Sequence, residues 1–258
     1  MGSLEPQFRC RLVQGGTDLA AAQRLRYRVF VQELGADGPL VDHATRREVD
    51  RFDAHSDHLI LVDERRDAAA LDHVVGVYRL MTADHAAQAG QFYSEGEYDL
   101  APLHDSGRRL LELGRSCLHP DYRGGMAMMH LWSALADHVH ATGVEILFGV
   151  ASFHGTDVAA LAGPLSILHH RHLAPGPLRV KARSPHGTPM GLLPEAQIDR
   201  TAAMRATPAL IKAYLRLGGC VGEGAWVDHA FNTTDVCLVV DTATMNARQR
   251  DLYRRVQP

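Results

Sequence analysis

The chain has little cysteine, no long apolar run and no excess of positive charge. Its four cysteines, Cys10, Cys117, Cys220 and Cys237, are widely spaced and form no CxxC pair. This spacing argues against a zinc ribbon or a disulfide framework and favours a reducing compartment. A formal net charge of −3, without a basic run or an interleaved aromatic patch, gives no support to nucleic-acid binding.

The sequence gives equally little support to a membrane-spanning or secreted protein. No stretch approaches the roughly 18–20 consecutive apolar residues of a transmembrane helix, and the N-terminal residues lack the apolar core of a signal peptide. With 46% apolar and 22% charged residues, the composition is that of an ordinary globular protein. We therefore expect a soluble protein with at most peripheral membrane contact.

The 258 residues predict a single α/β domain with a mixed sheet, without internal repeats or low-complexity linkers. Residues 58–63 and 74–80 are expected to form an antiparallel hairpin. Thr17 or Asp18 is the expected cap of the first helix. Five prolines predict a long irregular surface insertion at about residues 174–194. Further strands are expected at 8–13, 110–118, 144–150 and 236–240, and helices at 17–31, 126–140, 158–172, 208–217 and 245–255.

Residues 110–140 organise the chain, because a buried strand leads through the turn PDYRGG at 120–125 into a helix. Together with the strand at 144–150, this order implies a parallel pair of strands. A strand that runs through glycines into a helix presents free N–H groups and the positive end of the helix dipole, which suits a phosphate. The pattern is equally compatible with an ordinary strand–turn–helix connection.

Two charged residues, Glu112 and Arg115, interrupt this otherwise apolar strand. Buried charges are costly unless they are paired or used. On a regular strand residues three apart point to opposite faces, but Gly114 permits a bulge that could bring both to one side. The pair is therefore either a functional constellation or a structural ion pair at the rim of the sheet.

Two short motifs suggest functions that the expected secondary structure does not support. His58 and Asp63 have the HxxxxD spacing of glycerolipid acyltransferases, but on a strand a separation of five places them on opposite faces. The run at 169–172, HHRH, suggests a metal site. Only His169 and His172 would share a helix face, and a third ligand is missing, so we expect a polar surface there.

Charged and aromatic residues recur in a specific pattern: Leu25-Arg26, Phe30, Glu48-x-Asp50-x-Phe52-Asp53 and Glu112-x-x-Arg115. This pattern resembles the signature of the acyl-homoserine-lactone synthases, which belong to the GNAT superfamily of N-acyltransferases. Glu33 stands where those synthases carry a basic residue, and residues 34–36 lack their tryptophan.

Three further runs point to a neighbouring branch: RYRVFVQELGA at 26–36, SFHGTD at 152–157, and the segment from PALIKAYLRLGG to FNTTD at 208–235. They resemble the hemolysin-like acyltransferases and, more closely, the L-ornithine Nα-acyltransferases, over roughly residues 27–255. The resemblance implies a GNAT-like α/β fold, with a mixed sheet and a C-terminal helical extension.

The same resemblance implies transfer of a fatty acyl group, typically 3-hydroxyacyl, from acyl carrier protein to the α-amino group of ornithine. The product is lyso-ornithine lipid. The donor is a phosphopantetheine thioester, and no permanently bound metal or redox cofactor is implied. The hydrophobic product suggests a cytoplasmic protein that releases it at the inner membrane, in peripheral contact.

An amine that attacks a thioester needs a base and a site for the oxyanion. Glu112 is the expected base, directly or through a water, and Arg115 either holds Glu112 or binds the substrate carboxylate as a fork. Backbone N–H groups of Ser116, Cys117 and Leu118 are expected to meet the oxyanion. The turn residues Arg123, Gly124 and Gly125 would hold the phosphopantetheine phosphate.

Arg26, Phe30, Glu48, Asp50 and Asp53 are the other expected substrate-binding residues. In the resemblance the acids bind amino groups, with Asp50 nearer the substrate and Asp53 more structural. Alternatively, they cap a loop and pair with Arg26 or Arg28. Arginines of the first helix could also dock the acidic carrier protein, and Arg26 is expected to turn inward towards the acids.

Three functions remain open from the sequence. The first is acylation of an amino acid, ornithine in preference to glutamine or lysine. The second is an acyl-homoserine-lactone synthase that uses S-adenosylmethionine, against which the missing tryptophan and the C-terminal extension argue. The third is a non-catalytic protein that binds acyl carrier protein or lipid.

Overall fold

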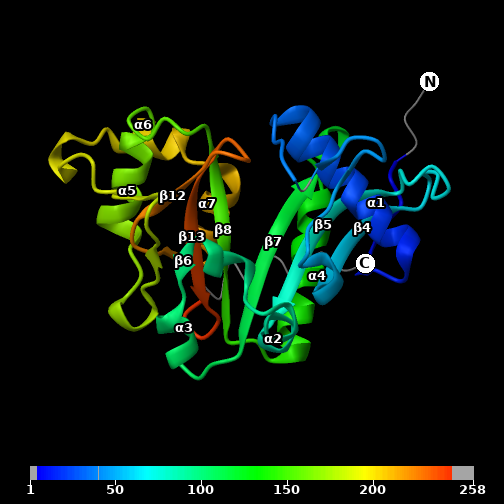
Figure 1. Ribbon diagram of the computed structural model, residues 1–258, viewed down its shortest axis with the longest axis horizontal. Coiled ribbons are helices and arrows are strands. Elements are labelled where there is room, and N and C mark those ends of the chain that lie inside the picture. Colours follow the sequence, from blue (N-terminus) through cyan, green and yellow to red (C-terminus); the bar gives the residue numbers. More distant parts are fainter. Residues whose placement is uncertain (1–4, 40, 246–258) are drawn as a thin grey trace. The chain divides into compact units, whose positions relative to one another are not determined.

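The computed structural model describes residues 5–39 and 41–245 (Figure 1). The chain divides into two compact units. In its described part the first unit comes from residues 5–39, 41–81 and 113–143, and the second from residues 82–112 and 144–245. The strand β7 (Leu110–Leu118) contains a crossing point from the second unit into the first, between Glu112 and Leu113.

The first unit contains an antiparallel run of strands. β1 (Phe8–Leu12) pairs with β4 (Asp57–Asp63), and β4 pairs with β5 (Val74–Thr82). The hairpin predicted from the two apolar runs is therefore confirmed. β7 follows β5 in the strand order.

Alternation along these strands divides the core of the first unit between two sheet faces. On one face α1 (Gly16–Arg26) and the segment after it pack against strand side chains. The cluster contains Ala21, Ala22, Leu25, Val29, Ile60, Val62, Val74, Val77 and Cys117. On the other face Leu61, Leu118 and Leu131 of α4 (Ala127–Thr142) surround Gly76, where an added Cβ would lie 2.7 Å from Leu118 Cδ2. Position 76 therefore has no room for a side chain.

The first helix differs from the prediction at both ends. Its N-cap is Gly15, not Thr17 or Asp18, because the Asp18 carboxylate instead accepts the Gln14 N–H and pairs with Arg11. After Arg26 the chain continues as the π-helix η1 (Tyr27–Glu33), which the apolar spacing did not indicate. The predicted inward face is confirmed, since Leu25 and Val29 are buried and Phe30 packs against them.

The organising stretch has the predicted form. β7 is followed by the short 3-10 helix η4 (Pro120–Tyr122), and α4 begins at Ala127. Elsewhere in the first unit, β2 (Val41–Asp42) pairs with β3 (Arg47–Glu48). The 3-10 helix η2 (Asp53–His55) then leads into β4.

The second unit contains the parallel strand pair that the sequence predicted. Residues Leu110, Leu111 and Glu112 of β7 align with Ile146, Leu147 and Phe148 of β8 (Ile146–His154). β8 pairs antiparallel with β13 (Thr233–Asp241), which also pairs with β12 (Ala225–Asp228) and β11 (Cys220–Val221). β10 (Gly187–Thr188) extends the run beyond β12. The remaining elements before β7 are α2 (Ala83–Ala89), η3 (Tyr93–Gly96), β6 (Tyr98–Asp99) and α3 (Ala101–Asp105).

The later helices of the second unit only partly follow the prediction. α5 (Ala162–His172) begins four residues later than expected, and α7 (Ala209–Arg216) is confirmed. α6 (Arg200–Ala206), capped by Asp199, was not predicted. The helix expected at 245–255 lies outside the described residues apart from its first position.

The proline-rich segment at 174–194 is irregular, as expected, but it is not simply a surface excursion. Ala174, Val180 and Met190 are buried. The segment contains η5 (Gly176–Leu178) and β9 (Lys181–Ala182), which pairs with β6, as well as β10. The 3-10 helix η6 (Glu195–Gln197) follows it. Within the described ranges, no helix is both long and apolar enough to cross a membrane.

Candidate functional site

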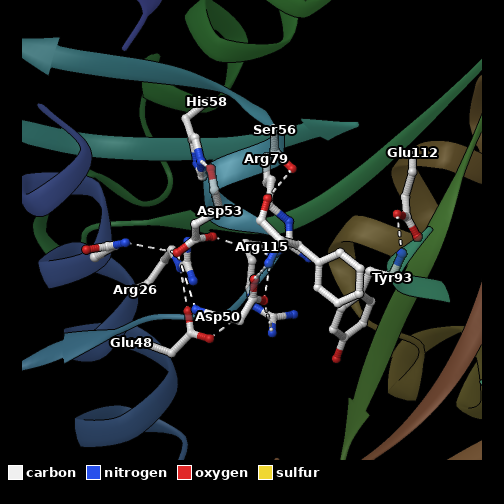
Figure 2. Close-up of polar contacts among 12 residues, drawn as sticks. Arg26, Glu48, Asp50, Asp53, Ser56, His58, Arg79, Tyr93, Glu112 and Arg115 are labelled. Carbon is white, nitrogen blue, oxygen red and sulfur yellow. Dashed lines mark hydrogen bonds and ion pairs between the residues drawn. The ribbon is translucent and has the colours of Figure 1, made fainter. Parts of the chain in front are cut away.

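Three arginines and three carboxylates of the first unit form a closed ring of alternating charge (Figure 2). Each side chain contacts two side chains of opposite charge, so the ring has equal numbers of positive and negative charges. In order, its members are Arg26, Glu48, Arg115, Asp50, Arg79 and Asp53, which returns to Arg26. All six side chains are at most 8% exposed.

Arg115 bridges two acids of the ring, with Nε 3.2 Å from Glu48 Oε1 and Nη2 2.9 Å from Asp50 Oδ2. Arg79 Nη1 lies 2.5 Å from Asp50 Oδ2 and 3.5 Å from Asp53 Oδ1. Arg26 donates from Nη1 to Asp53 Oδ1 at 2.7 Å and from Nε to Glu48. The predicted inward turn of Arg26 towards the acids is confirmed.

The spacing of the ExDxFD motif explains how one short segment supplies three acids. Asp50 Oδ1 accepts the N–H of Phe52 at 2.8 Å, so the carboxylate also caps its own loop. Phe52 is buried, and the guanidinium carbons of Arg51 and Arg79 lie 4.4 and 5.5 Å from its ring centroid. The aromatic residue therefore anchors the segment beneath two cations.

The ring keeps Asp53, Asp50 and Arg26 charged at neutral pH. Burial alone would raise the pKa of Asp53, but Arg26 and Arg79 outweigh it and lower that pKa to about 2. Burial is likewise outweighed at Asp50, whose pKa Arg79 and Arg115 hold below its usual value. Burial would lower the pKa of Arg26, and Glu48 and Asp53 reverse that effect and raise it. Mutual pairing thus offsets the cost of burying six charges.

Arg79 is the ring member that was not predicted from the sequence. It is the only charged residue in the apolar run of β5, and that isolation was the available signal. Gln23 and His58 complete the surroundings of Asp53: Gln23 Nε2 donates to its carboxylate at 2.9 Å, and His58 Nε2 lies 3.1 Å from its carbonyl oxygen. Burial lowers the pKa of His58, so its ring is neutral.

The backbone of β7 is irregular beside the ring. Arg115 has a φ of 52°, in the left-handed region that non-glycine residues rarely adopt. Gly114 was the predicted position for such an irregularity, and the structure places it one residue later. A residue held in this conformation costs of order 1–3 kcal/mol and persists where its surroundings fix it. The contacts of Arg115 with Glu48 and Asp50 provide that fixation.

Glu112 is held within the second unit by two backbone donors. Figure 2 shows the contact with Tyr93. Its Oε2 accepts the N–H of Tyr93 at 2.8 Å, and its Oε1 accepts the N–H of Ser94 at 2.6 Å. The residue is 3% exposed. Tyr93 and Ser94 open η3, so the carboxylate meets free N–H groups at the start of a helical turn. Neither of these two backbone donors was predicted from the sequence.

The predicted phosphate turn is open at its glycines. Gly124 has a φ of 77°, and an added Cβ there would meet no atom within 4 Å. Arg123, by contrast, is engaged: its Nη2 lies 2.7 Å from Glu33 Oε2, and it also donates to the carbonyl of Leu118. Glu33, which departs from the lactone-synthase pattern, is thus the partner of the turn arginine.

The remaining predicted site residues are Ser116, Cys117 and Leu118 of β7. The side chain of Cys117 belongs to the buried cluster beside Phe30, and that of Leu118 closes against Gly76. Cys117 and Leu118 can therefore serve an oxyanion only through main-chain groups, whereas Ser116 is half-buried. All four cysteines are free. Burial raises the pKa of the Cys10 and Cys117 thiols to about 12, that of Cys220 to about 11, and that of Cys237 as well.

His58 and Asp63 of the HxxxxD motif have different partners in the structure. His58 contacts the Asp53 carbonyl, whereas Asp63 accepts a hydrogen bond from the Tyr122 hydroxyl at 2.7 Å. Across residues 5–39 and 41–245, the potential metal ligands that gather in a group of three are the carboxylates Glu97, Asp228 and Asp235. That group contains none of the histidines at 169–172.

Comparison with solved structures supports the fold. A CoA-dependent acyl-homoserine lactone synthase, BjaI, matches with a TM-score of 0.53 and 16% identity, over 96% of this chain and 88% of its own. The acyl-homoserine lactone synthase LasI matches with a TM-score of 0.51 and 14% identity, over 96% and 95%. The expected GNAT-like mixed α/β fold is confirmed, since residues 25–133 also match the acetyltransferase (GNAT) domain family.

Sequence relatives extend over the whole chain. An L-ornithine N(alpha)-acyltransferase of Rhodobacter capsulatus is 57% identical over 255 residues, which cover 99% of this chain and 98% of the relative. Another, of Brucella abortus, is 39% identical over 98% of this chain and 89% of the relative. The protein is therefore an acyltransferase that belongs to the L-ornithine Nα-acyltransferase family.

Proposed function

We propose that the protein transfers a fatty acyl group, typically 3-hydroxyacyl, from the phosphopantetheine thioester of acyl carrier protein to the α-amino group of L-ornithine. The observation that carries this proposal is the 57% identity to an L-ornithine N(alpha)-acyltransferase along nearly the whole chain. The product is lyso-ornithine lipid, which a second acylation would complete. We expect its release at the cytoplasmic face of the inner membrane.

In the proposed reaction the neutral α-amine attacks the thioester carbonyl and forms a tetrahedral oxyanion. The C–S bond then breaks, the thiolate leaves, and the proton lost by the amine passes to the base and on to the thiolate or water. A free α-amino group has a pKa of roughly 7.7–8.0, so a moderate base suffices. Direct attack is supported by the cysteine thiols, whose raised pKa values leave almost no thiolate for an acyl-cysteine intermediate.

Glu112 remains the proposed base. Its carboxylate oxygens are fixed by the N–H groups of Tyr93 and Ser94, so its direction is set before a substrate arrives. A carboxylate at this position could act as a general base by taking a proton from the amine, directly or through a bridging water. This positioning favours a role in chemistry over a mobile surface charge.

The ring is proposed to hold β7 in its irregular conformation, and through it the N–H groups of residues 116–118 that would meet the oxyanion. Arg115 carries the positive φ and bonds Glu48 and Asp50. Asp50 contacts the arginine of β7 directly, whereas Asp53 is held by Arg26, Arg79 and Gln23. This difference supports the expected division in which Asp50 is nearer the substrate and Asp53 is structural.

One reconstitution tests donor and acceptor together. The purified protein is incubated with 3-hydroxyacyl carrier protein or the corresponding acyl-CoA, and with ornithine, lysine, glutamine or S-adenosylmethionine in separate reactions. Mass spectrometry should find Nα-acylornithine as the main product, with the carrier protein as the better donor. A lactone from S-adenosylmethionine, or preferred acylation of another amino acid, would overturn the acceptor assignment.

A further inference from the structure

A basic pocket of about 230 Å³ in the first unit has no part in the proposed chemistry. Its polar wall comes from α1, η1 and the turn between β2 and β3, and His119 follows the end of β7. The side chains that matter for its charge are Arg24, Arg28, Arg46, Asp72 and His119.

Its three arginines differ from those of the ring because they have no anionic partner. Arg24, Arg28 and Arg46 are exposed, and none makes an ion pair with the described residues. Arg24 and Arg28 are four residues apart along continuous helix, so they lie near one another on its surface. Arg46 joins them although its φ of 52° is unfavourable for a non-glycine residue.

The other charged groups of the wall do not neutralise these arginines. Asp72 is already paired with Arg66. His119 is 2% exposed, its Nδ1 accepts the N–H of Asp121 at 3.3 Å, and the Asp121 carboxylate lies 3.6 Å from the same nitrogen. Burial and the nearby Arg28 lower the pKa of His119, so its ring is neutral at pH 7. Among residues 5–39 and 41–245, no ion pair compensates the three positive charges of the pocket.

We infer that this pocket is an anion-binding site for a phosphomonoester group. Three guanidinium groups offer forked N–H donors whose geometry matches phosphate oxygens. A phosphomonoester carries nearly two negative charges at pH 7 and balances them better than a single carboxylate does. The ligand is either a soluble phosphomonoester or the headgroup of phosphatidic acid, and both present the same chemistry.

Binding of inorganic phosphate to the purified full chain tests the site without any acyl transfer, so the result is independent of the proposed function. Isothermal titration calorimetry should show one site. The double variant Arg28→Gln/Arg46→Gln should weaken it at least about tenfold, as the loss of charge-assisted hydrogen bonds predicts. Arg200→Gln, which removes the same charge from an exposed position of the second unit, should bind like the wild type. Isotope-labelled histidine should show a shift of the His119 ring on binding.

Circular dichroism checks that the double variant is folded, and the single variant Arg24→Gln gives a second measure. Absence of phosphate binding, equal weakening by Arg200→Gln, or an unmoved His119 resonance would each overturn the site. Co-sedimentation with vesicles of phosphatidylcholine, with and without phosphatidic acid, then assigns the source. Binding to phosphatidic acid that the double variant loses identifies a lipid headgroup. Phosphate binding without added sedimentation on phosphatidic acid vesicles identifies a soluble ligand.

Discussion

At the scale of single residues, the ring gives each charge two partners, and no member can lose its charge without stranding two others. Asp53, for example, bonds Arg26 and Arg79, and Glu48 bonds Arg26 and Arg115. A buried charge that has lost its partner destabilises the fold far more than an intact buried ion pair does. Neutralising one ring residue should therefore harm stability more than the loss of one ordinary hydrogen bond would.

Arg79→Gln tests this cooperation. It leaves Asp50 and Asp53 with fewer positive partners, and we expect a loss of about 3–5 kcal/mol in the free energy of unfolding, measured by urea denaturation. Arg9→Gln, which removes an exposed arginine paired with Glu64, is the control and should cost less than about 1 kcal/mol. Equal effects of the two variants would contradict a cooperative ring.

The depressed pKa of Asp53 predicts how stability depends on acid. Because that pKa is about 2 in the folded chain and roughly 3.9 when unfolded, the charged carboxylate stabilises the fold above about pH 4. This contribution, about 2–3 kcal/mol, is lost as the pH falls from about 4 to 2. Unfolding free energies measured across this range should fall more steeply for the wild type than for Asp53→Asn. Parallel curves would contradict the assignment.

Glu112→Gln tests the proposed base. General bases typically contribute about 10²–10⁴-fold in rate, so single-turnover acyl transfer should fall by at least about 10²-fold, while binding of the carrier protein persists. The control Glu64→Gln removes a more exposed acid of the first unit. If Glu112→Gln turns over at the wild-type rate, Glu112 is not the base.

At the scale of helices and strands, residue patterns within a segment predicted those elements whose formation depends mainly on that segment. The apolar strand, the glycine turn and the following helix have the expected order, as does the β4–β5 hairpin. The π-helix η1, the helix α6 and the anchored segment around Val180 were missed, because they depend on packing against residues distant in the sequence. The ExDxFD and ExxR motifs indicated four ring members, and Arg26 of the first helix was the fifth. Arg79 and the donors to Glu112 became evident only from tertiary contacts.

Gly76 on β5 shows how tightly two elements approach. A methyl group there would lie 2.7 Å from Leu118 Cδ2 and 3.4 Å from Leu131 Cδ2, so Gly76→Ala must shift the buried Leu118 side chain. We expect a loss of about 1–3 kcal/mol in unfolding free energy, typical of overpacking. Gly16→Ala, at the start of α1 with nothing within 4 Å of its added Cβ, is the matched control and should be neutral. Thermal denaturation distinguishes them, and a neutral Gly76→Ala would contradict the close packing.

At the scale of the whole molecule, many of the arginines that the structure describes form ion pairs, and the net charge of the sequence is −3. An acidic carrier protein would gain nothing from such an overall charge. Its docking must therefore depend on a local basic surface, and Arg24 and Arg28 remain available for it now that Arg26 is known to be buried. Surface charges of this kind act mainly on the rate of encounter.

Salt should consequently weaken the use of the carrier protein more than the chemical step. Exposed charges are screened within about 3 Å at 1 M salt and about 10 Å at 0.1 M. Raising the salt from about 0.05 to 0.5 M should lower kcat/KM for acyl carrier protein roughly tenfold, with kcat little changed. The same acyl group on free pantetheine has no acidic protein to steer, so its kcat/KM should hardly move. If both donors respond alike, salt acts on the enzyme itself, and electrostatic docking of the carrier is wrong.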